Sequence, residues 1–479
     1  MSELSSWVQP GNYQAENHFY PRVPNAQLHP LVRHFLSLGN ARIAQRYCHL
    51  HPEANPEAVH EVLNQPTRYL RWAGADLIHA TTPDGVRRNV VIEVNSSPSG
   101  QKSMPLRNEE DERGGYATLL ERSFLPLLKR RGLPKGALAV LWDKNEMEVT
   151  GYASVLADLT GERVLLARLP TSEGRDAVRC SDDGVLSVKD PEGNWTPLRA
   201  AFRYVTQRPW DRIPPLTRTA VLNPVVACLA GGRNKLLAAH AYHQANLRLA
   251  DSGLRIRTPE TRWNVTREEV PGIVAEMGGV AVVKDPYSNA GQGVYTLTTP
   301  AELQAFMDSP LRYGRLIVQA LIGNASWSSK SKEGQFYHLG TVPDHRGRIY
   351  VADVRFMVGA SEQGFYPLAL YARRARAPLA KNITPDMDSW SMLGTNLSVK
   401  TGDGQFTTEP NRLLLMDRKD FNQLGIGLDD LTEGYIQTVL SIQAIDRVAE
   451  ELITTKGRFR KRRFVALNPD AALASEICE

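Results

Sequence analysis

The sequence predicts a mixed α/β protein, and three stretches of hydrophobic patterning carry that prediction. Residues 136–170 alternate strand, helix and strand, the pattern of a β-α-β unit. Residues 66–105 hold two apolar strands separated by a Pro-Asp-Gly turn. Residues 429–455 carry helical apolar spacing over a long segment. With 479 residues and 42% hydrophobic composition, the chain can form a large core and two or three domains.

Composition limits the classes of protein to which the chain can belong. Lysine and arginine number 57 against 52 aspartates and glutamates, a surplus too small to favour nucleic acid as a partner. The four cysteines form no CxxC pair, so neither a disulfide framework nor a zinc site is predicted. No signal-peptide pattern is visible, and no apolar run approaches the roughly 20 residues of a membrane helix. We therefore expect a cytoplasmic protein with no membrane partner.

The patterning divides the chain into five segments. We expect an irregular arm and helices in 1–65, paired strands in 66–106, an α/β domain in 107–235, a larger module in 236–455 and a basic tail in 456–479. The tail has one aromatic residue, Phe459, between its positive charges. This favours a solvated or intramolecular role for the tail over contact with RNA or a membrane surface.

A lysine at the end of an apolar strand precedes a loop of small residues. Lys284 is followed by a loop that contains Ser288, Asn289, Gly291 and Gly293. Small residues let backbone N–H groups approach phosphate oxygens, and the ammonium offsets their charge. The loop is suited to a polyphosphate, although a plain hairpin remains the alternative when the loop is considered alone.

Lys235 stands at the start of the helix expected over residues 232–250. A lysine there lies against the unfavourable end of the helix dipole, and an anionic ligand nearby would relieve it. A solvated surface lysine is the alternative that the sequence leaves open.

Oxygen donors gather on the two strands of residues 66–105. Glu93 and Asn95 are two apart and leave the same face of one strand, and Asp76 joins them if the strands pair through the Pro-Asp-Gly turn. Three oxygen donors on one sheet face are typical of a site for a hard cation such as Mg²⁺. A turn-facing polar cluster is the alternative, but an unpaired carboxylate inside a Val/Ile-rich strand is unfavourable, which favours the metal site.

Guanidinium and amide groups follow on later strands. Asp353 and Arg355 share one strand face, and three arginines and Asn396 come after them; the arginines are Arg373, Arg374 and Arg376. Such an array can hold a transferring phosphate and a developing oxyanion. The alternatives are an ion pair of Arg355 with Asp353 and a solvated face for the arginine triplet.

Together these features resemble the ATP-grasp superfamily over residues 235–451 and 66–105. That family's motifs occur here in order as Lys235, Pro259–Thr261, Lys284 with 288–293, a hydrophobic hinge at Val318–Ile322 and Asp353–Arg355. Its G-x-D and E-V-N-x-S-P motifs match Gly74–Asp76 and Glu93–Pro98, which stand at the amino-terminal end instead of last. The chain therefore resembles a circularly permuted member.

The resemblance implies a fold, a set of ligands and a reaction. The fold would be an ATP-grasp module with mixed and antiparallel sheets and a Rossmann-like pre-ATP-grasp domain. ATP would be bound by Lys235, Lys284, Ser288, Asn289, Gly291, Gly293, Gln319, Ala320 and Ile322. Asp76, Glu93 and Asn95 would hold Mg²⁺, with Mn²⁺ as the alternative, and Arg355, Asn396 and Arg376 would be catalytic. The implied enzyme joins a carboxylate to an amine through an acyl phosphate, using amino-acid or peptide substrates.

Three alternatives remain open at this stage. The acidic hinge residue of the family is replaced here by Gln319-Ala320. The first alternative is that residues 464–470 take the place of the E-x-N strand, with Ala466 where glutamate would stand. An ATP-grasp phosphotransferase would phosphorylate its substrate without making an amide. A nucleotide-binding protein without catalysis is the third class. Homodimers are common among such ligases, so a homodimer is compatible with the resemblance.

Overall fold

The strands of the molecule form three large sheets and a two-stranded ribbon within the part that the computed structural model describes. That part comprises residues 4–108, 110–170, 177–288, 291–332, 334–400 and 406–478. The mixed α/β class, with mixed and antiparallel sheets, is confirmed. The ribbon consists of β17 (Ser398–Lys400) and β18 (Phe406–Thr408).

The first sheet belongs to an α/β domain built around the predicted β-α-β unit. Its strands run in the order β1-β5-β4-β8-β7-β6, with β9 beside β8. β4 pairs in parallel with both β5 and β8, and α6 (Glu146–Thr160) connects β4 to β5. The strands are β1 (Ser5–Val8), β4 (Ala137–Trp142), β5 (Val164–Arg168), β6 (Val178–Cys180), β7 (Leu186–Lys189), β8 (Trp195–Tyr204) and β9 (Ala220–Leu222). The arm expected to be irregular thus contributes an edge strand, β1, antiparallel to β5.

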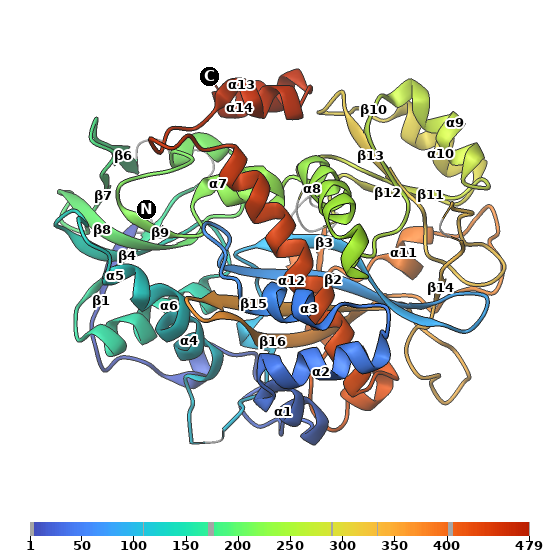
Figure 1. The fold of residues 1–479 in the computed structure, drawn as a ribbon, viewed down its shortest axis with the longest axis horizontal. Helices are drawn as coiled ribbons and strands as arrows, with labels where there is room; N and C mark the ends of the chain where they lie inside the picture. Colours follow the sequence, from blue (N-terminus) through green and yellow to red (C-terminus); the bar gives the residue numbers. More distant parts are fainter. Residues whose placement is uncertain are drawn as a thin grey trace.

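The second sheet joins strands from distant parts of the chain. Its order is β14-β2-β15-β16-β19, and β3 also pairs with β2. The bounds are β2 (Trp72–Thr81), β3 (Arg87–Ser96), β14 (Tyr337–His338), β15 (Ala352–Ser361), β16 (Gly364–Arg374) and β19 (Leu413–Leu414). Figure 1 shows the blue β2 and β3 beside the orange β15 and β16 in the middle of the molecule. The amino-terminal strand pair is therefore built into a sheet made largely by residues after 335.

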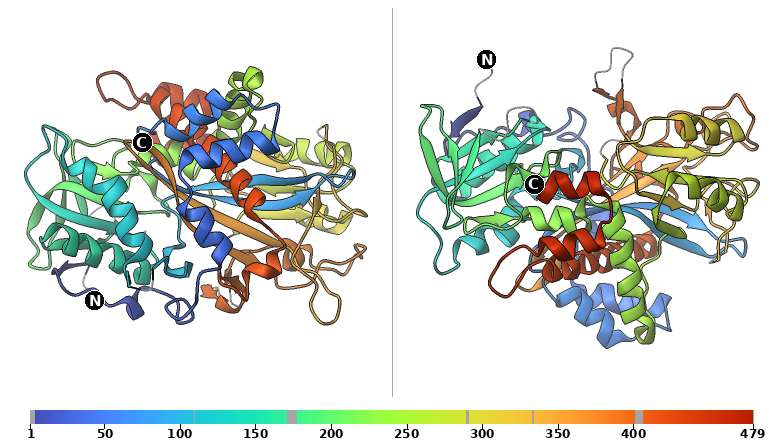
Figure 2. Two further views of the ribbon diagram at one scale, coloured as in Figure 1. Left: turned by 60° about the horizontal axis from the view of Figure 1, so that its bottom comes forward. Right: turned by 90° about the horizontal axis from the view of Figure 1, so that it is seen from above.

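The third sheet is smaller and has a core of its own. It is antiparallel, in the order β10-β13-β11-β12, with β10 (Thr261–Val265), β11 (Ala281–Lys284), β12 (Val294–Leu297) and β13 (Leu316–Gln319). α9 (Val270–Glu276) and α10 (Pro300–Asp308) contribute Val270, Val274 and Phe306 to this separate apolar cluster. Figure 2 shows this lobe and the α/β domain on opposite sides of the central helices.

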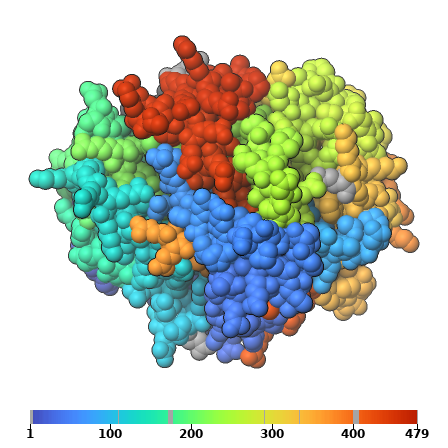
Figure 3. Space-filling model, in the orientation of Figure 1, coloured from blue at the N-terminus to red at the C-terminus, as the bar shows by residue number. Residues whose placement is uncertain are grey.

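Helices hold the second sheet in place. α12 (Leu428–Glu451) crosses the molecule and packs against β2, β3 and β15 and against α8 (Lys235–Arg248). Its buried residues surround the helix, as expected for a helix enclosed by other elements. Three amino-terminal helices pack beside it: α1 (Pro30–Ser37), α2 (Asn40–Leu50) and α3 (Pro56–Asn64). Figure 3 shows amino-terminal and carboxy-terminal segments adjoining on one face.

Further short helices complete the described chain. They are α4 (Gly114–Leu119), α5 (Leu125–Leu128), α7 (Val225–Ala227) and α11 (Ser389–Leu393). None of the described helices is long and apolar enough to cross a membrane.

The segment expected to be a tail is folded. It contains α13 (Lys461–Leu467) and α14 (Ala471–Cys478), with Phe464 and Leu473 buried. Asn468 accepts a hydrogen bond from Asn234 at 2.6 Å. The alternative that 464–470 supplies an E-x-N strand is wrong, because most of this stretch is helical and contains no strand. In so short a stretch, the apolar spacing of the sequence did not distinguish a helix from a strand.

A buried aspartate on α12 fixes the chain where it enters β2. Oδ1 of Asp446 accepts hydrogen bonds from the backbone N–H groups of Tyr69 and Leu70 at 2.8 and 2.7 Å. Oδ2 accepts one from Arg68 at 2.7 Å. Three buried or partly buried donors thus depend on one side chain.

We expect Asp446→Ala to lower the free energy of unfolding by about 3 kcal/mol, because those donors lose their acceptor. The midpoint of urea unfolding measures the loss. Asp429→Ala is a matched control on the same helix, since its ion pair with Arg46 is exposed and should contribute less than about 1 kcal/mol. Equal midpoints for the two variants would contradict this role of Asp446.

Candidate functional site

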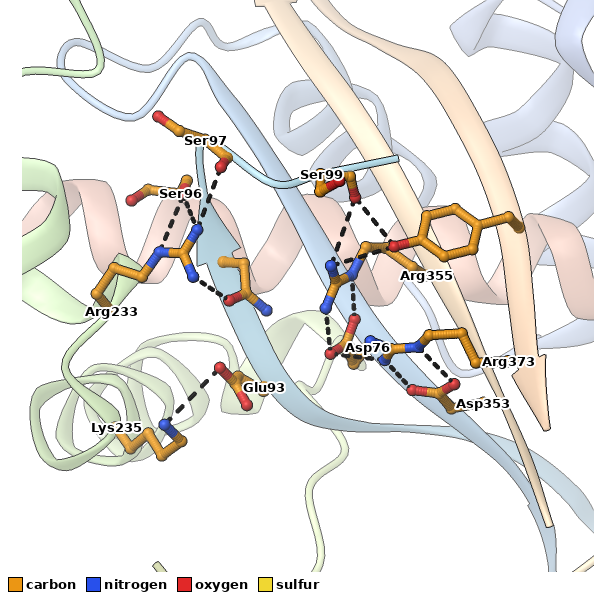
Figure 4. Close-up of polar contacts among 12 residues, drawn as sticks. Asp76, Glu93, Ser96, Ser97, Ser99, Arg233, Lys235, Asp353, Arg355 and Arg373 are labelled. Carbon is orange, nitrogen blue, oxygen red and sulfur yellow. Dashed lines mark hydrogen bonds and ion pairs between the residues drawn. The ribbon is translucent and has the colours of Figure 1, made fainter. Parts of the chain in front are cut away.

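A row of polar side chains crosses the second sheet on one face. Glu93 on β3 lies opposite Asp76 on β2, Asp76 lies opposite Arg355 on β15, and Arg355 lies opposite Tyr371 on β16. A bulge at Ile92 shifts the register by one residue between Leu77 and Asp76, and the pairing then continues from Glu93 to Ser96. Directly opposed residues share a sheet face, so the register places these groups on one face. Figure 4 shows Asp76 joined to Arg355 and Arg373, and Glu93 beside Lys235.

Two carboxylates and two guanidiniums form a buried network in this row. Arg355 donates from Nε and Nη2 to the two Asp76 oxygens at 2.6 and 2.7 Å. Arg373 donates to Asp353 and lies 2.9 Å from Asp76. Burial raises the pKa of Asp76, but the two guanidiniums outweigh it and hold that pKa below its ordinary value. The ion pair considered between Asp353 and Arg355 is thus replaced by crossed pairs, Arg355 with Asp76 and Arg373 with Asp353.

Lys284 is buried at the end of β11 and points at the second sheet. Its ammonium donates to Gln319 Oε1 at 2.7 Å and to the backbone oxygen of Ile92 at 3.2 Å. Burial lowers its pKa to about 8, while the charge of Glu93 opposes that change. Gln319 in turn donates to Thr261 at 3.0 Å. The third sheet therefore presents a desolvated cation beside Glu93.

Lys235 holds the loop that follows Lys284. It is the first residue of α8, which Asn234 caps by accepting from the N–H of Leu237. Its ammonium donates to the backbone oxygen and Oγ of Ser288 at 3.1 and 3.0 Å, and lies 3.8 Å from Glu93. The alternative of a solvated surface lysine is wrong, since its side chain is 10% exposed.

The glycines of this loop have a packing role. Gly291 has φ +77°, and a Cβ there would lie 2.7 Å from Trp390 and 2.8 Å from Asn396. Gly293 has φ +62°, and a Cβ there would meet the carboxylate of Asp285 at 2.3 Å. Both positions need a residue without a side chain. Asn289 lies outside the described residues.

Arg233 is a member of the site that the sequence did not predict. It donates to Asn95 Oδ1 at 2.8 Å and to the backbone oxygens of Ser96 and Ser97 at 2.9 and 3.1 Å. It thereby ties the start of α8 to the end of β3. Its position two residues before Lys235, after a Gly-Gly pair, was the available signal.

The oxygen donors fit a metal ion in part. Glu93 makes no hydrogen bond within the described chain; its carboxylate lies 3.8 Å from the Lys235 ammonium, and its charge also acts on Lys284 and Arg233. Asn95 Oδ1 accepts from Arg233, while its Nδ2 is buried without a partner. Both oxygens of Asp76 are occupied by guanidiniums. Among the described residues no group of three His, Cys, Asp or Glu side chains is arranged around one point. A hard cation would thus depend on Glu93 and on oxygens from a ligand.

Three cavities adjoin at Glu93, which lines all of them. A cavity of about 120 Å³ lies between the second and third sheets; we call it the apolar cavity after its wall of Ile78, Ile92, Val282, Leu321 and Ile322, although charged residues including Asp76, Lys284, Asp353 and Arg373 line the rest of it. A polar cavity of about 190 Å³ contains Asp76, Asn95, Ser288 and Arg355. A groove of about 700 Å³ runs along α8 past Lys235 and Lys284. One cleft therefore joins an apolar end, a cationic middle and a polar end.

The remaining predicted residues divide between the cleft and the surface. Gln319, Ala320 and Ile322 line the apolar cavity, and Asn396 lines both the apolar and the polar cavities. Arg376 lines none of these three cavities; it pairs with Glu409 at 2.7 Å and is 43% exposed. This position does not agree with the catalytic place expected for Arg376, whereas Arg373 lines both the polar and the apolar cavities. β16 ends at Arg374, so the strand no longer aims Arg376 at the cleft.

No family description and no curated protein matches the sequence. Among solved structures the chain is similar to a glutathione synthetase-like effector from Globodera pallida, at 9% identity over 74% of this chain and 86% of that chain, with a TM-score of 0.38. It is also similar to a RimK domain ATP-grasp protein from Sphaerobacter thermophilus, at 12% identity, 49% and 90% coverage and a TM-score of 0.27. A D-alanyl-alanine synthetase A from Vibrio cholerae gives 12% identity, 55% and 94% coverage and 0.27. Likenesses at these scores assign no function.

Proposed function

We propose that the chain is an ATP-dependent ligase of the ATP-grasp type, which activates a carboxylate as an acyl phosphate and joins it to an amine. The meeting of Glu93 with Lys235 and Lys284 in one cleft carries this proposal. These groups come from β3, α8 and β11, so the fold has assembled two cations and a carboxylate that makes no hydrogen bond in the described chain. A polyphosphate ligand needs that combination, with the carboxylate reserved for its metal ion.

The shape of the cleft supports an orientation for ATP. The apolar cavity would take the base, against Ile92, Val282 and the backbone of Ala320. Lys284 and Lys235 would then face the phosphates from the third sheet and from α8. Ser288 and Gly291 line the polar cavity and would help to exclude water from the reacting groups.

The second sheet would supply the groups that act on the transferring phosphate. The acid substrate attacks the γ-phosphorus, ADP leaves, and the amine then displaces phosphate from the acyl carbon with loss of a proton. Arg355 lines the polar cavity, and its hydrogen bond to Asp76 fixes the orientation of the guanidinium. It can therefore offset the charge of the transferring group without a change in its own conformation. Asn396 faces the same place from the segment before β17. When bound, Mg²⁺ or Mn²⁺ held by Glu93 would offset the charge of the phosphates. Asn95 could join it only if Arg233 released Oδ1, and Asp76 only if the guanidiniums of Arg355 and Arg373 moved away.

The order of elements supports a circular permutation as part of this proposal. β2 and β3 carry the G-x-D and E-V-N motifs, and α12, near the carboxyl end, packs directly against both. Joining the end of α12 to the start of β2 would restore the family's usual order. The hydrogen bonds of Asp446 to residues 68–70 lie at this junction.

Hydroxylamine trapping tests the proposed reaction. We expect ADP release that depends on an added carboxylic acid, with formation of a hydroxamate when hydroxylamine replaces the amine, across a panel of amino acids and peptides with MgATP. A phosphorylated product that forms equally without any amine would favour the phosphotransferase. ATP binding without ADP release over the whole panel would favour a non-catalytic nucleotide-binding protein.

A further inference from the structure

The wall of the polar cavity that faces away from the third sheet carries two lysines without counter-ions. Lys102 lies in the 3₁₀ turn Gln101–Ser103 after β3, and Lys144 follows β4 of the α/β domain. Neither ammonium makes a hydrogen bond or ion pair with any residue in the described part of the chain; Lys102 lies 5.2 Å from the ring centre of Tyr20. Lys102 is 8% exposed and lines the cavity.

The other cations of this cavity all have partners. Arg355 and Arg373 are matched by Asp76 and Asp353, Arg233 by Asn95 and two carbonyl oxygens, and Lys235 by Ser288 and Glu93. Buried or partly buried charges are unfavourable unless they are paired. Lys102 and Lys144 therefore stand out as charges whose partner has to come from a ligand.

The carboxylate nearest to Lys144 in the chain is already committed. Asp143 accepts from the backbone N–H groups of Thr206 and Gln207 at 2.8 and 2.7 Å and pairs with Arg212 at 3.1 Å. Glu148 accepts from Ser99, Gly100 and Gln101 at 2.7 to 3.0 Å. Burial lowers the pKa of Lys144 to about 8; the positive charge of Arg233 adds to the effect, and the negative charge of Asp143 opposes it. The local carboxylates thus build the wall and leave Lys144 to the cavity.

Lys144 also lies at a position from which α/β domains bind ligands. β4 and β8 are neighbouring parallel strands, and Lys144 and Thr206, which both line the cavity, come directly after their carboxyl ends. In open α/β sheets ligands bind beyond the carboxyl ends of the strands. The α/β domain therefore faces the phosphate-binding side of the cleft with this edge.

We propose that the acid substrate carries a second anionic group, a carboxylate or a phosphate, and that Lys144 and Lys102 bind it while the first carboxylate reacts. This inference rests on the proposed function, because the proposed function assigns the opposite wall of the cavity to ATP. The two lysines select among acids, and they do not take part in bond formation. A monocarboxylic acid would leave both ammonium groups without a partner.

Equilibrium binding tests the substrate class without requiring turnover. The probes are pairs that differ by one anionic group: the isosteric pairs L-glutamate with L-glutamine and L-aspartate with L-asparagine, and O-phospho-L-serine with L-serine, which lacks the phosphoryl group. We expect at least one member with two anionic groups to bind about tenfold or more tightly than its partner. Calorimetry measures the affinities with and without a MgATP analogue that cannot be hydrolysed. The phosphoserine pair separates a phosphate from a carboxylate as the second group.

Two variants locate the binding. Lys144→Met and Lys102→Met should each abolish most of the preference, while Lys135→Met should keep it, because Lys135 is exposed at the opposite end of β4. The inference is overturned if no pair shows a preference, if the preference survives both cavity variants, or if the ATP analogue competes with the dianion. Failure of the proposed function is separate, since it would appear as absent ADP release while the binding preference remained.

Discussion

Glu93→Gln should reduce the rate of ADP release by about 100-fold or more while leaving the fold intact. Glutamine keeps the size of the side chain and loses only its charge, and Glu93 makes no hydrogen bond in the described chain that the change would break. The rate would fall because the neutral glutamine no longer attracts the metal ion that accompanies the phosphates. Stopped assays of ADP and circular dichroism of both proteins measure the two effects.

Glu362→Gln is the matched control for this experiment. Glu362 is exposed in the turn between β15 and β16 of the same sheet and lines none of the three cavities. We expect its turnover to stay within about twofold of the original protein, as for most surface substitutions. If folded Glu93→Gln protein turned over as fast as this control, Glu93 would not be a ligand of the metal ion.

The polar row was predictable in part because it follows from strand geometry. The period of two places Glu93 and Asn95 on one face, and the Pro-Asp-Gly turn pairs β2 with β3. The turn alone would set Asp76 opposite Ile92; the bulge at Ile92, which the sequence does not show, brings Glu93 opposite Asp76. The same local reasoning predicted β4, α6 and β5 close to their observed bounds. Local periodicity and turn chemistry are sufficient for such features, since they involve neighbours along the chain.

The partners of these groups could not be predicted, because they depend on which distant strand lies next to β2. Asp76 and Arg355 are 279 positions apart, and only the pairing of β2 with β15 makes them an ion pair. The sequence therefore left Asp76 as a metal ligand with free oxygens. Lys144 was missed for a similar reason: its loop carries no glycine motif, and its importance comes from the cavity at the edge of a parallel sheet.

Lys284→Met should weaken the binding of ATP about 30-fold or more, the second largest effect that we expect. The ammonium is buried between the sheets, so its hydrogen bonds to phosphate oxygens would form in a site of low dielectric, where a charged hydrogen bond contributes about 2 kcal/mol or more. Methionine preserves the length and apolar body of the side chain. Calorimetric titration with the ATP analogue measures the affinity, and Lys330→Met, an exposed lysine of the same lobe, should leave it unchanged.

The same lysine predicts how ATP affinity depends on pH. Burial lowers the pKa of Lys284 to about 8, so in the free protein the ammonium loses its proton as the pH rises through that value. Phosphate binds the protonated form, and the affinity for ATP should therefore be full below pH 7 and decline above about pH 8. The Lys284→Met protein lacks this group and should bind ATP weakly with no such decline between pH 7 and 9. An alkaline decline of equal size in both proteins would assign it to another group and would separate Lys284 from the phosphates.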